Sequence, residues 1–162
     1  MEIPVFVVEQ ASAPGATSTA ATSSVKLTSS VGNPEYKNIL ALFATTTSPN
    51  IKRKLLVKNT GGALHISWAG SIDSTPYYFC ANDICKKEIL IKPRSKLISF
   101  DFFPGRDDLL IMGAADGIYV TEIDDRSTQN IQTLLKGKNL DFRIDDGVIY
   151  IKKDKNLYYV SF

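Results

Sequence analysis

Short apolar runs separated by polar turn residues extend from residue 51 to the end of the chain. Runs rich in β-branched and aromatic residues, bounded by Gly, Pro, Asn and Asp, are typical of strands and turns. Their spacing of about ten residues predicts an antiparallel all-β chain. The expected strands are Lys52–Val57, Ala63–Trp68, Tyr77–Cys80, Glu88–Ile91, Leu97–Phe103, Leu109–Met112, Ile118–Ile123, Ile131–Leu135, Leu140–Ile144, Val148–Lys152 and Leu157–Phe162.

The first 50 residues follow a different pattern. Residues 3–8, IPVFVV, predict a strand within an N-terminal segment 1–10. Residues 11–24, ASAPGATSTAATSS, carry no charge and no bulky apolar side chain, so we expect a flexible linker or loop, with an O-glycosylated stalk as the alternative. VKLTSS at 25–30 and YKNILALFATTT at 36–47 are both expected to be extended. NILALFA could form a helical turn, but Thr45 to Thr47 and Pro49 favour the extended structure.

The last third of the chain contains a weak repeat of about 40 residues. Asp101-Phe102 aligns with Asp141-Phe142, and the run beginning at Ile118 aligns with the run beginning at Leu157. Four strands in a repeat of this length are typical of a β-propeller blade. Unbroken apolar runs such as LLIM at 109–112 suit inner strands that are covered on both faces. We therefore expect four-stranded antiparallel sheets in a propeller-like arrangement, with a β-sandwich as the alternative fold.

The domain predicted over residues 25–162 contains about three blades, at residues 51–91, 96–136 and 139–162. The last of these has only three expected strands, and we expect the N-terminal segment IPVFVV to supply the fourth. Closed propellers have about four to eight blades. The chain is therefore expected to be the C-terminal part of a larger propeller, a smaller sheet assembly, or a self-associating unit.

Charge and hydropathy argue against a nucleic-acid partner and against a membrane-spanning helix in this chain. The 19 basic and 17 acidic residues give a net charge of +2, which is too even to predict a nucleic-acid partner. No apolar run approaches the roughly 18 residues that a membrane-spanning helix needs, so we expect no membrane span in this chain.

The segments FDFFPGRDDLLIMGAADGIYVTEIDDRSTQNIQ and LDFRIDDGVIYIKKDKNLYYVSF, together with TPYYFC, support a resemblance to a known family. They resemble the C-terminal blades of WD-repeat- or TolB-like propellers in PEGA-domain proteins of candidate-phylum, Parcubacteria-type bacteria. The resemblance covers residues 51–162 and rests on strands and turns rather than on catalytic signatures. It implies a β-propeller fold and supplies no catalytic residue.

The only two cysteines, Cys80 and Cys85, enclose the turn-forming sequence ANDI and are expected to face each other across a hairpin. That placement suits a disulfide, although free thiols remain the alternative. Zinc is disfavoured because only two thiols and His65 are available as ligands. A disulfide would place the domain outside the reducing cytoplasm, at the surface of a bacterium.

No other candidate forms a catalytic pattern. His65, the only histidine, is expected on the polar face of a strand. The acidic pairs Asp107-Asp108, Asp124-Asp125 and Asp145-Asp146 lie in turn sequences, where aspartate caps backbone amides. No nucleophile elbow, zinc-binding helix or phosphate-binding loop is present.

We therefore expect a domain without enzymatic activity, catalytic residues, cofactor or metal, which binds a protein or glycan partner or acts as a scaffold. Further propeller blades or a second copy of the chain are also possible partners. Two alternatives stay open: a hydrolase-type propeller whose site is completed by missing N-terminal blades, and a purely structural segment of a surface protein.

Overall fold

Small antiparallel β-sheets make up most of the described chain. The computed structural model describes residues 6–7, 23–29, 34–44, 51–52, 54–124, 126 and 129–160. The prediction of a mostly β chain is confirmed, and one short α-helix accompanies the sheets. Most of the linker predicted at residues 11–24 lies outside the described residues.

The first sheet has the order β3-β4-β5-β8 and is antiparallel throughout. The single strand expected at Lys52–Val57 is wrong, because Lys54 adopts a positive φ of 68° and turns the chain back between two strands. The four strands are β3 (Ile51–Lys52), β4 (Leu55–Thr60), β5 (Ala63–Trp68) and β8 (Glu88–Ile91).

The middle sheet is an antiparallel meander in the order β12-β11-β10-β9. The strands of the middle sheet are β9 (Leu97–Phe102), β10 (Leu109–Ala114), β11 (Gly117–Glu122) and β12 (Ile131–Lys136). The last sheet has the order β1-β2-β15-β14-β13. Its strands are β1 (Phe6–Val7), β2 (Ser23–Ser29), β13 (Leu140–Asp145), β14 (Val148–Lys153) and β15 (Asn156–Val160).

The last sheet takes its fourth strand from the N-terminal part of the chain, as expected, but the strand is not the expected one. β2 pairs antiparallel with β15, where Val160 lies opposite Val25 and Tyr158 lies opposite Leu27. In the described part of the segment IPVFVV, Phe6 and Val7 form β1, which pairs in parallel with the other edge of β2. The predicted strand at VKLTSS is confirmed over residues 25–29, and Ser30 lies outside the described residues. The linker predicted at 11–24 is wrong at Ser23 and Ser24, which already belong to β2.

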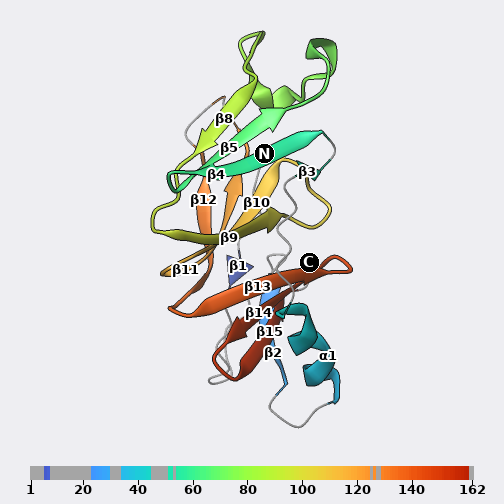
Figure 1. The fold of residues 1–162 in the computed structure, drawn as a ribbon, viewed down its shortest axis with the longest axis vertical. Helices are drawn as coiled ribbons and strands as arrows, with labels where there is room; N and C mark the ends of the chain where they lie inside the picture. Colours follow the sequence, from blue (N-terminus) through green and yellow to red (C-terminus); the bar gives the residue numbers. More distant parts are fainter. Residues whose placement is uncertain are drawn as a thin grey trace, which may run out of the picture.

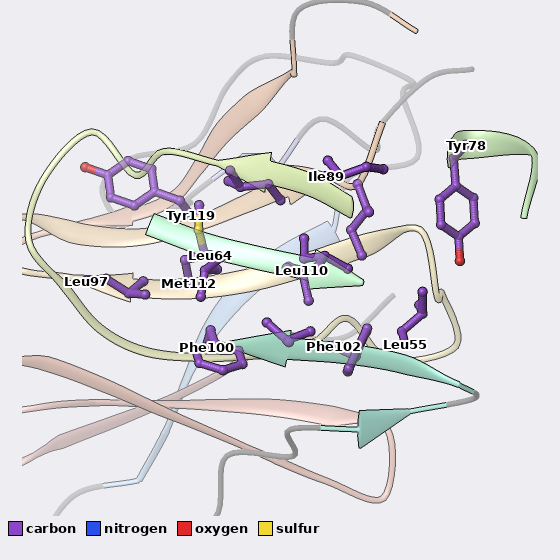
Figure 2. Close-up of a cluster of buried hydrophobic side chains, with 14 of the residues drawn as sticks. Leu55, Leu64, Tyr78, Ile89, Leu97, Phe100, Phe102, Leu110, Met112 and Tyr119 are labelled. Carbon is purple, nitrogen blue, oxygen red and sulfur yellow. The ribbon is translucent and has the colours of Figure 1, made fainter. Parts of the chain in front are cut away.

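The three sheets follow one another along the long axis of the molecule, with the middle sheet between the other two (Figure 1). One apolar core fills the space between the first and middle sheets, and a second core lies between the middle and last sheets. All six residues of β10 are buried, because side chains on its two faces enter different cores. The prediction that LLIM is an inner strand covered on both faces is confirmed. Figure 2 shows Leu55, Leu64 and Ile89 of the first sheet among Phe102, Leu110 and Met112 of the middle sheet.

A helix, α1 (Pro34–Leu42), covers the outer face of the last sheet. The extended structure expected for residues 36–47 is therefore wrong over its helical part. Proline is well suited to a first helical turn, where its fixed φ matches the helix and no amide partner is needed. Ile39 of α1 packs with Leu157 and Tyr150 of the last sheet. Phe43, four residues later and directly after the helix, joins the same cluster. Burial of this apolar face outweighs the local preference for extended structure.

The first sheet has a different outer face, on the side away from its core. Lys58 and Glu88 are exposed there and His65 is half-buried, whereas Leu64 and Ile66 on the opposite face are fully buried. His65 Nδ1 and Glu88 Oε1 are 3.1 Å apart across β5 and β8. The placement predicted for His65 on the polar face is confirmed, and this end of the stack carries polar side chains.

The repeated Asp-Phe pair protects two sheet edges. Asp101 lies on β9 and Asp141 on β13, and each strand is the edge strand of its sheet. The Asp101 carboxylate accepts the backbone N–H of Phe102 at 2.6 Å, and the Asp141 carboxylate accepts that of Phe142 at 2.9 Å. An unpaired N–H on an edge strand is a template for pairing with another chain. The aspartate satisfies it while the phenylalanine enters the core.

We expect Asp101→Ala to lower the free energy of unfolding by about 1 kcal/mol, because the Phe102 amide loses its acceptor. The exposed amide should also increase self-association of the variant. Asp101→Asn keeps an acceptor oxygen and serves as the control. Chemical denaturation and light scattering measure the two effects, and equal behaviour of both variants would contradict this role.

Candidate binding surface

The first sheet departs from the simple four-stranded plan at one place, between β5 and β8. Residues 69–87 connect these strands, and we call this segment the insertion. The equivalent connection in the middle sheet, between β11 and β12, covers only residues 123–130. The insertion contains the helical turns η1 (Ile72–Ser74) and η2 (Tyr77–Phe79) and the strands β6 (Cys80–Ala81) and β7 (Ile84–Cys85). It forms projecting loops at the end of the molecule opposite α1 (Figure 1).

A tryptophan fixes the start of the insertion. The Trp68 indole Nε1–H donates to the carbonyl oxygen of Ser71 at 2.9 Å, so the chain folds back over the ring. A Cβ atom at Gly70 would lie 2.3 Å from the indole atom Cζ2, and only glycine allows this approach. The Thr75 hydroxyl then donates to the Ile72 carbonyl at 2.7 Å and closes η1.

The strand expected at Tyr77–Cys80 is wrong over Tyr77–Phe79, because these three aromatic residues form the 3-10 turn η2, and only Cys80 belongs to a strand, β6. Pro76 precedes the turn, and its carbonyl oxygen accepts the backbone N–H of Phe79 at 2.9 Å. Phe79 is fully buried and Tyr78 nearly so, both within the core shared with the middle sheet. Figure 2 shows Tyr78 beside one end of this core. The turn therefore anchors the insertion with two aromatic rings and directs Tyr77 outward.

A small hairpin follows η2 and contains the disulfide between Cys80 and Cys85. The two cysteines are direct partners in the β6–β7 ladder, and Ala81 pairs with Ile84. The connection is therefore a two-residue turn rather than a four-residue loop. Asn82 and Asp83 have φ values of 49° and 63°, the left-handed conformation that asparagine and aspartate tolerate in tight hairpins. The hairpin places the side chain of Ile84 in solvent.

Two arginine–aspartate pairs lie next to the insertion, at one end of the middle sheet. Asp108 immediately precedes β10, Asp124 follows β11, and the Ile123 N–H donates to the Asp108 carbonyl oxygen at 2.8 Å. Both aspartates are buried, with 7% of their surface exposed. Arg106 donates to both carboxylate oxygens of Asp108, at 2.7 and 2.6 Å. The Arg126 guanidinium similarly contacts both oxygens of Asp124.

Tyr77 joins the insertion to these pairs. The Arg126 guanidinium carbon lies 5.0 Å from the centre of the Tyr77 ring, within the range of a cation–π contact. The Tyr77 hydroxyl donates a long hydrogen bond of 3.5 Å to Asp108. We call Tyr77, Arg106, Asp108, Asp124 and Arg126 the arginine–tyrosine cluster. It links two sheets through side chains that remain partly accessible to solvent.

The ion pairs change the pKa values in the arginine–tyrosine cluster. Hydrogen bonds from Arg106 lower the pKa of the Asp108 carboxyl against the opposing effect of burial, and Arg126 lowers the pKa of Asp124 in the same way. Burial, followed by the charge of Asp108, raises the pKa of the Tyr77 hydroxyl. Both carboxylates are therefore ionised at neutral pH and are engaged by arginine. This arrangement suits fixed structural charges better than a general acid and base.

The lowered pKa values predict a pH dependence of stability. A carboxyl whose pKa is lower in the folded state stabilises the fold above its unfolded pKa of about 3.9, and this contribution is lost as the pH falls through the folded-state pKa. We expect the stability of the wild type to decrease below about pH 4. The double variant Asp108→Asn/Asp124→Asn should be less stable at neutral pH and have a shallower decrease. Urea denaturation at a series of pH values measures both slopes, and parallel curves would contradict the prediction.

The structure brings two of the sequence candidates, Asp108 and Asp124, together in the arginine–tyrosine cluster and places the other described candidates elsewhere. His65 lies on the outer face of the first sheet, Asp146 lies in the β13–β14 turn with a φ of 44°, and Asp125 lies outside the described residues. The sequence analysis missed the arginine–tyrosine cluster. A pattern in the sequence could have indicated this cluster. In the segment RDD, Arg106 lies two residues before Asp108, and in the segment DDR, Arg126 lies two residues after Asp124.

Within the described ranges, no three His, Cys, Asp or Glu side chains gather closely enough to hold a metal ion. None of the helices in the same ranges has the length and apolar character needed to cross a membrane. Comparison of the chain with protein-family models, with curated proteins and with solved structures finds no match. The function must therefore be argued from the residues themselves.

Proposed function

We propose that the chain is a non-catalytic binding or scaffolding domain and that the insertion contacts a protein partner. One observation carries the proposal. Among the described residues, five large hydrophobic side chains are exposed, and three of them lie on the insertion: Ile72 at 64%, Tyr77 at 54% and Ile84 at 72%. Apolar side chains on a segment anchored by Trp68, Tyr78 and Phe79 form a preorganised surface, which lowers the entropic cost of binding. We call Ile72, Tyr77 and Ile84, with Arg106 and Arg126, the insertion surface.

The composition of the insertion surface favours a protein over a glycan. Isoleucine side chains offer no hydrogen bonds to sugar hydroxyls, whereas they suit the dry centre of a protein interface. Tyrosine and arginine are the residue types most often found at energetic hot spots of such interfaces. Both arginines already have a carboxylate partner, so the surface does not select for a strongly acidic partner.

The proposed scaffold is propeller-like, in the sense of successive four-stranded sheets that pack face to face. The two apolar cores and the strand that β2 contributes to the last sheet support this description. The resemblance to the propellers of PEGA-domain proteins agrees with it. The two ends differ from the middle: α1 packs on the last sheet, and the outside of the first sheet carries His65 and Glu88 beside the exposed Leu90. These ends favour an open stack over a closed ring.

The Cys80–Cys85 disulfide supports a location outside the reducing cytoplasm, as proposed for a bacterial surface domain. The hydrolase alternative would need acids that are free to exchange protons. Asp108 and Asp124 are each held by an arginine, which favours the binding function.

The proposal is tested by capture with matched variants. The immobilised full chain, with its disulfide intact, is exposed to extracts of its source organism, and any captured protein is identified and titrated against the purified chain. We expect Ile72→Ser/Ile84→Ser to weaken binding at least about tenfold, since each side chain contributes to the centre of the contact.

Ile98→Ser is the matched control, because Ile98 is also exposed, at 61%, but lies on β9 outside the insertion. A glycan array is probed in parallel. Two outcomes would overturn the proposal. One is an equal loss of binding in Ile72→Ser/Ile84→Ser and in Ile98→Ser, and the other is specific binding to a glycan that does not require the insertion.

A further inference from the structure

The hairpin that carries Ile84 depends on few interactions other than the disulfide. β6 and β7 have two residues each and form a two-stranded sheet of their own, separate from the larger sheets. Only the pairs Cys80–Cys85 and Ala81–Ile84 make up its ladder. An isolated two-stranded hairpin is marginally stable in water, even when it is longer than this one. The covalent bond is therefore the main constraint on the position of Ile84.

The base of the hairpin is held independently of the disulfide. The Lys86 N–H donates to the Phe79 carbonyl oxygen at 2.9 Å, and the Phe79 ring is fully buried between the first and middle sheets. The next strand, β8, pairs with β5 from Glu88 onward. Loss of the disulfide would therefore release residues 80–85 and leave the remainder of the insertion in place.

We infer that the Cys80–Cys85 disulfide is a redox control on the insertion surface: its reduction by a dithiol releases Ile84 from its fixed position and weakens binding of the protein partner. This inference deepens the proposed function and rests on it for the effect on the partner. The effect on the conformation of the hairpin can be tested without any partner.

The reaction is an ordinary thiol–disulfide exchange. A thiolate of the dithiol attacks one cysteine sulfur, the Cys80–Cys85 bond breaks, and a mixed disulfide forms as the other cysteine leaves as a thiolate. The second thiolate of the reductant then attacks the reductant's own sulfur in the mixed disulfide. This step releases the remaining protein cysteine as a thiolate and leaves the reductant as a cyclic disulfide. The protein gains two electrons and two protons, and the dithiol loses the same number.

The surroundings favour this exchange. Both cysteines are only half-buried, so a reductant can approach them. Lys86 and Lys87 follow Cys85 and are exposed, and nearby positive charge stabilises a departing thiolate.

The first experiment measures amide hydrogen exchange of the full chain with and without dithiothreitol. We expect exchange of the amides of Ala81 and Ile84, the hydrogen-bonded pair of the β6–β7 ladder, to become at least about tenfold faster on reduction, while exchange in β10 and β11 stays unchanged. The double variant Cys80→Ser/Cys85→Ser should exchange like the reduced protein and should not respond to dithiothreitol. Unchanged exchange at Ala81 and Ile84, or faster exchange throughout the sheets, would overturn the inference.

The second experiment separates this inference from the proposed function. The affinity of the captured partner is measured for the oxidised protein, the reduced protein and Ile72→Ser/Ile84→Ser. Weaker binding of both the reduced protein and the isoleucine variant supports the redox control. If only the isoleucine variant binds more weakly, the redox inference fails while the proposed function stands. If the isoleucine variant binds normally, the insertion is not the contact surface and both fail.

Discussion

The Ile111→Ala variant is expected to have a free energy of unfolding about 2–5 kcal/mol lower than the wild type. Ile111 lies in the centre of β10 with no exposed surface, in the core between the middle and last sheets. Loss of three methylene-sized groups there removes apolar burial and leaves a cavity, because sheets pack on both sides of β10 and restrict relaxation. Urea denaturation monitored by the fluorescence of Trp68, the only tryptophan, measures the change.

Ile98→Ala is the matched control for this prediction. The same change in the same sheet, at a side chain with 61% of its surface exposed, should alter the stability by less than about 0.5 kcal/mol. Comparable losses in the two variants would show that β10 is not covered on both faces.

Deletion of residues 1–44 should have a second large effect, increased self-association. The deletion removes β2, which pairs with β15, and α1, which covers Leu157. The fragment would expose an unpaired strand edge next to an apolar sheet face, and both features promote association. Size-exclusion chromatography with light scattering measures the outcome, and we expect large oligomers or aggregates.

A shorter deletion controls for loss of the N-terminus as such. Deletion of residues 1–22 removes β1 but keeps β2 and α1, and this variant should elute like the intact chain. A peptide of residues 23–44, added to the longer deletion during refolding, should restore part of the species that the intact chain forms. An unchanged elution and an equal stability after deletion of 1–44 would contradict the donated strand.

The sequence predicts those parts of the fold that depend on local patterns. The unbroken apolar run at β10, the strands at Ala63–Trp68 and Glu88–Ile91, and the repeated Asp-Phe pair all follow from residue type and spacing. Strand boundaries elsewhere agree within a few residues, because Gly, Asn and Asp mark most of the turns.

The features that sequence analysis missed depend on contacts between distant segments. α1 is short and gains its stability from Leu157 and Tyr150, which follow more than 100 residues later. The turn η2 buries Phe79 against another sheet, which no local pattern shows. The arginine–tyrosine cluster combines Tyr77 with residues around 106 and 126, so only the folded chain brings it together.

Because the three sheets are stacked in series, the free energy of unfolding is expected to depend on each sheet and on the interface between successive sheets. Among the described residues, one apolar core joins the first sheet to the middle sheet and another joins the middle sheet to the last, as in a short solenoid, so the total stability is approximately a sum of layer and interface terms. The end layers each have one large neighbour and can open by fraying, whereas the central layer opens only when both interfaces are lost. A local opening at the disulfide-bearing end therefore need not propagate to the end that is covered by α1.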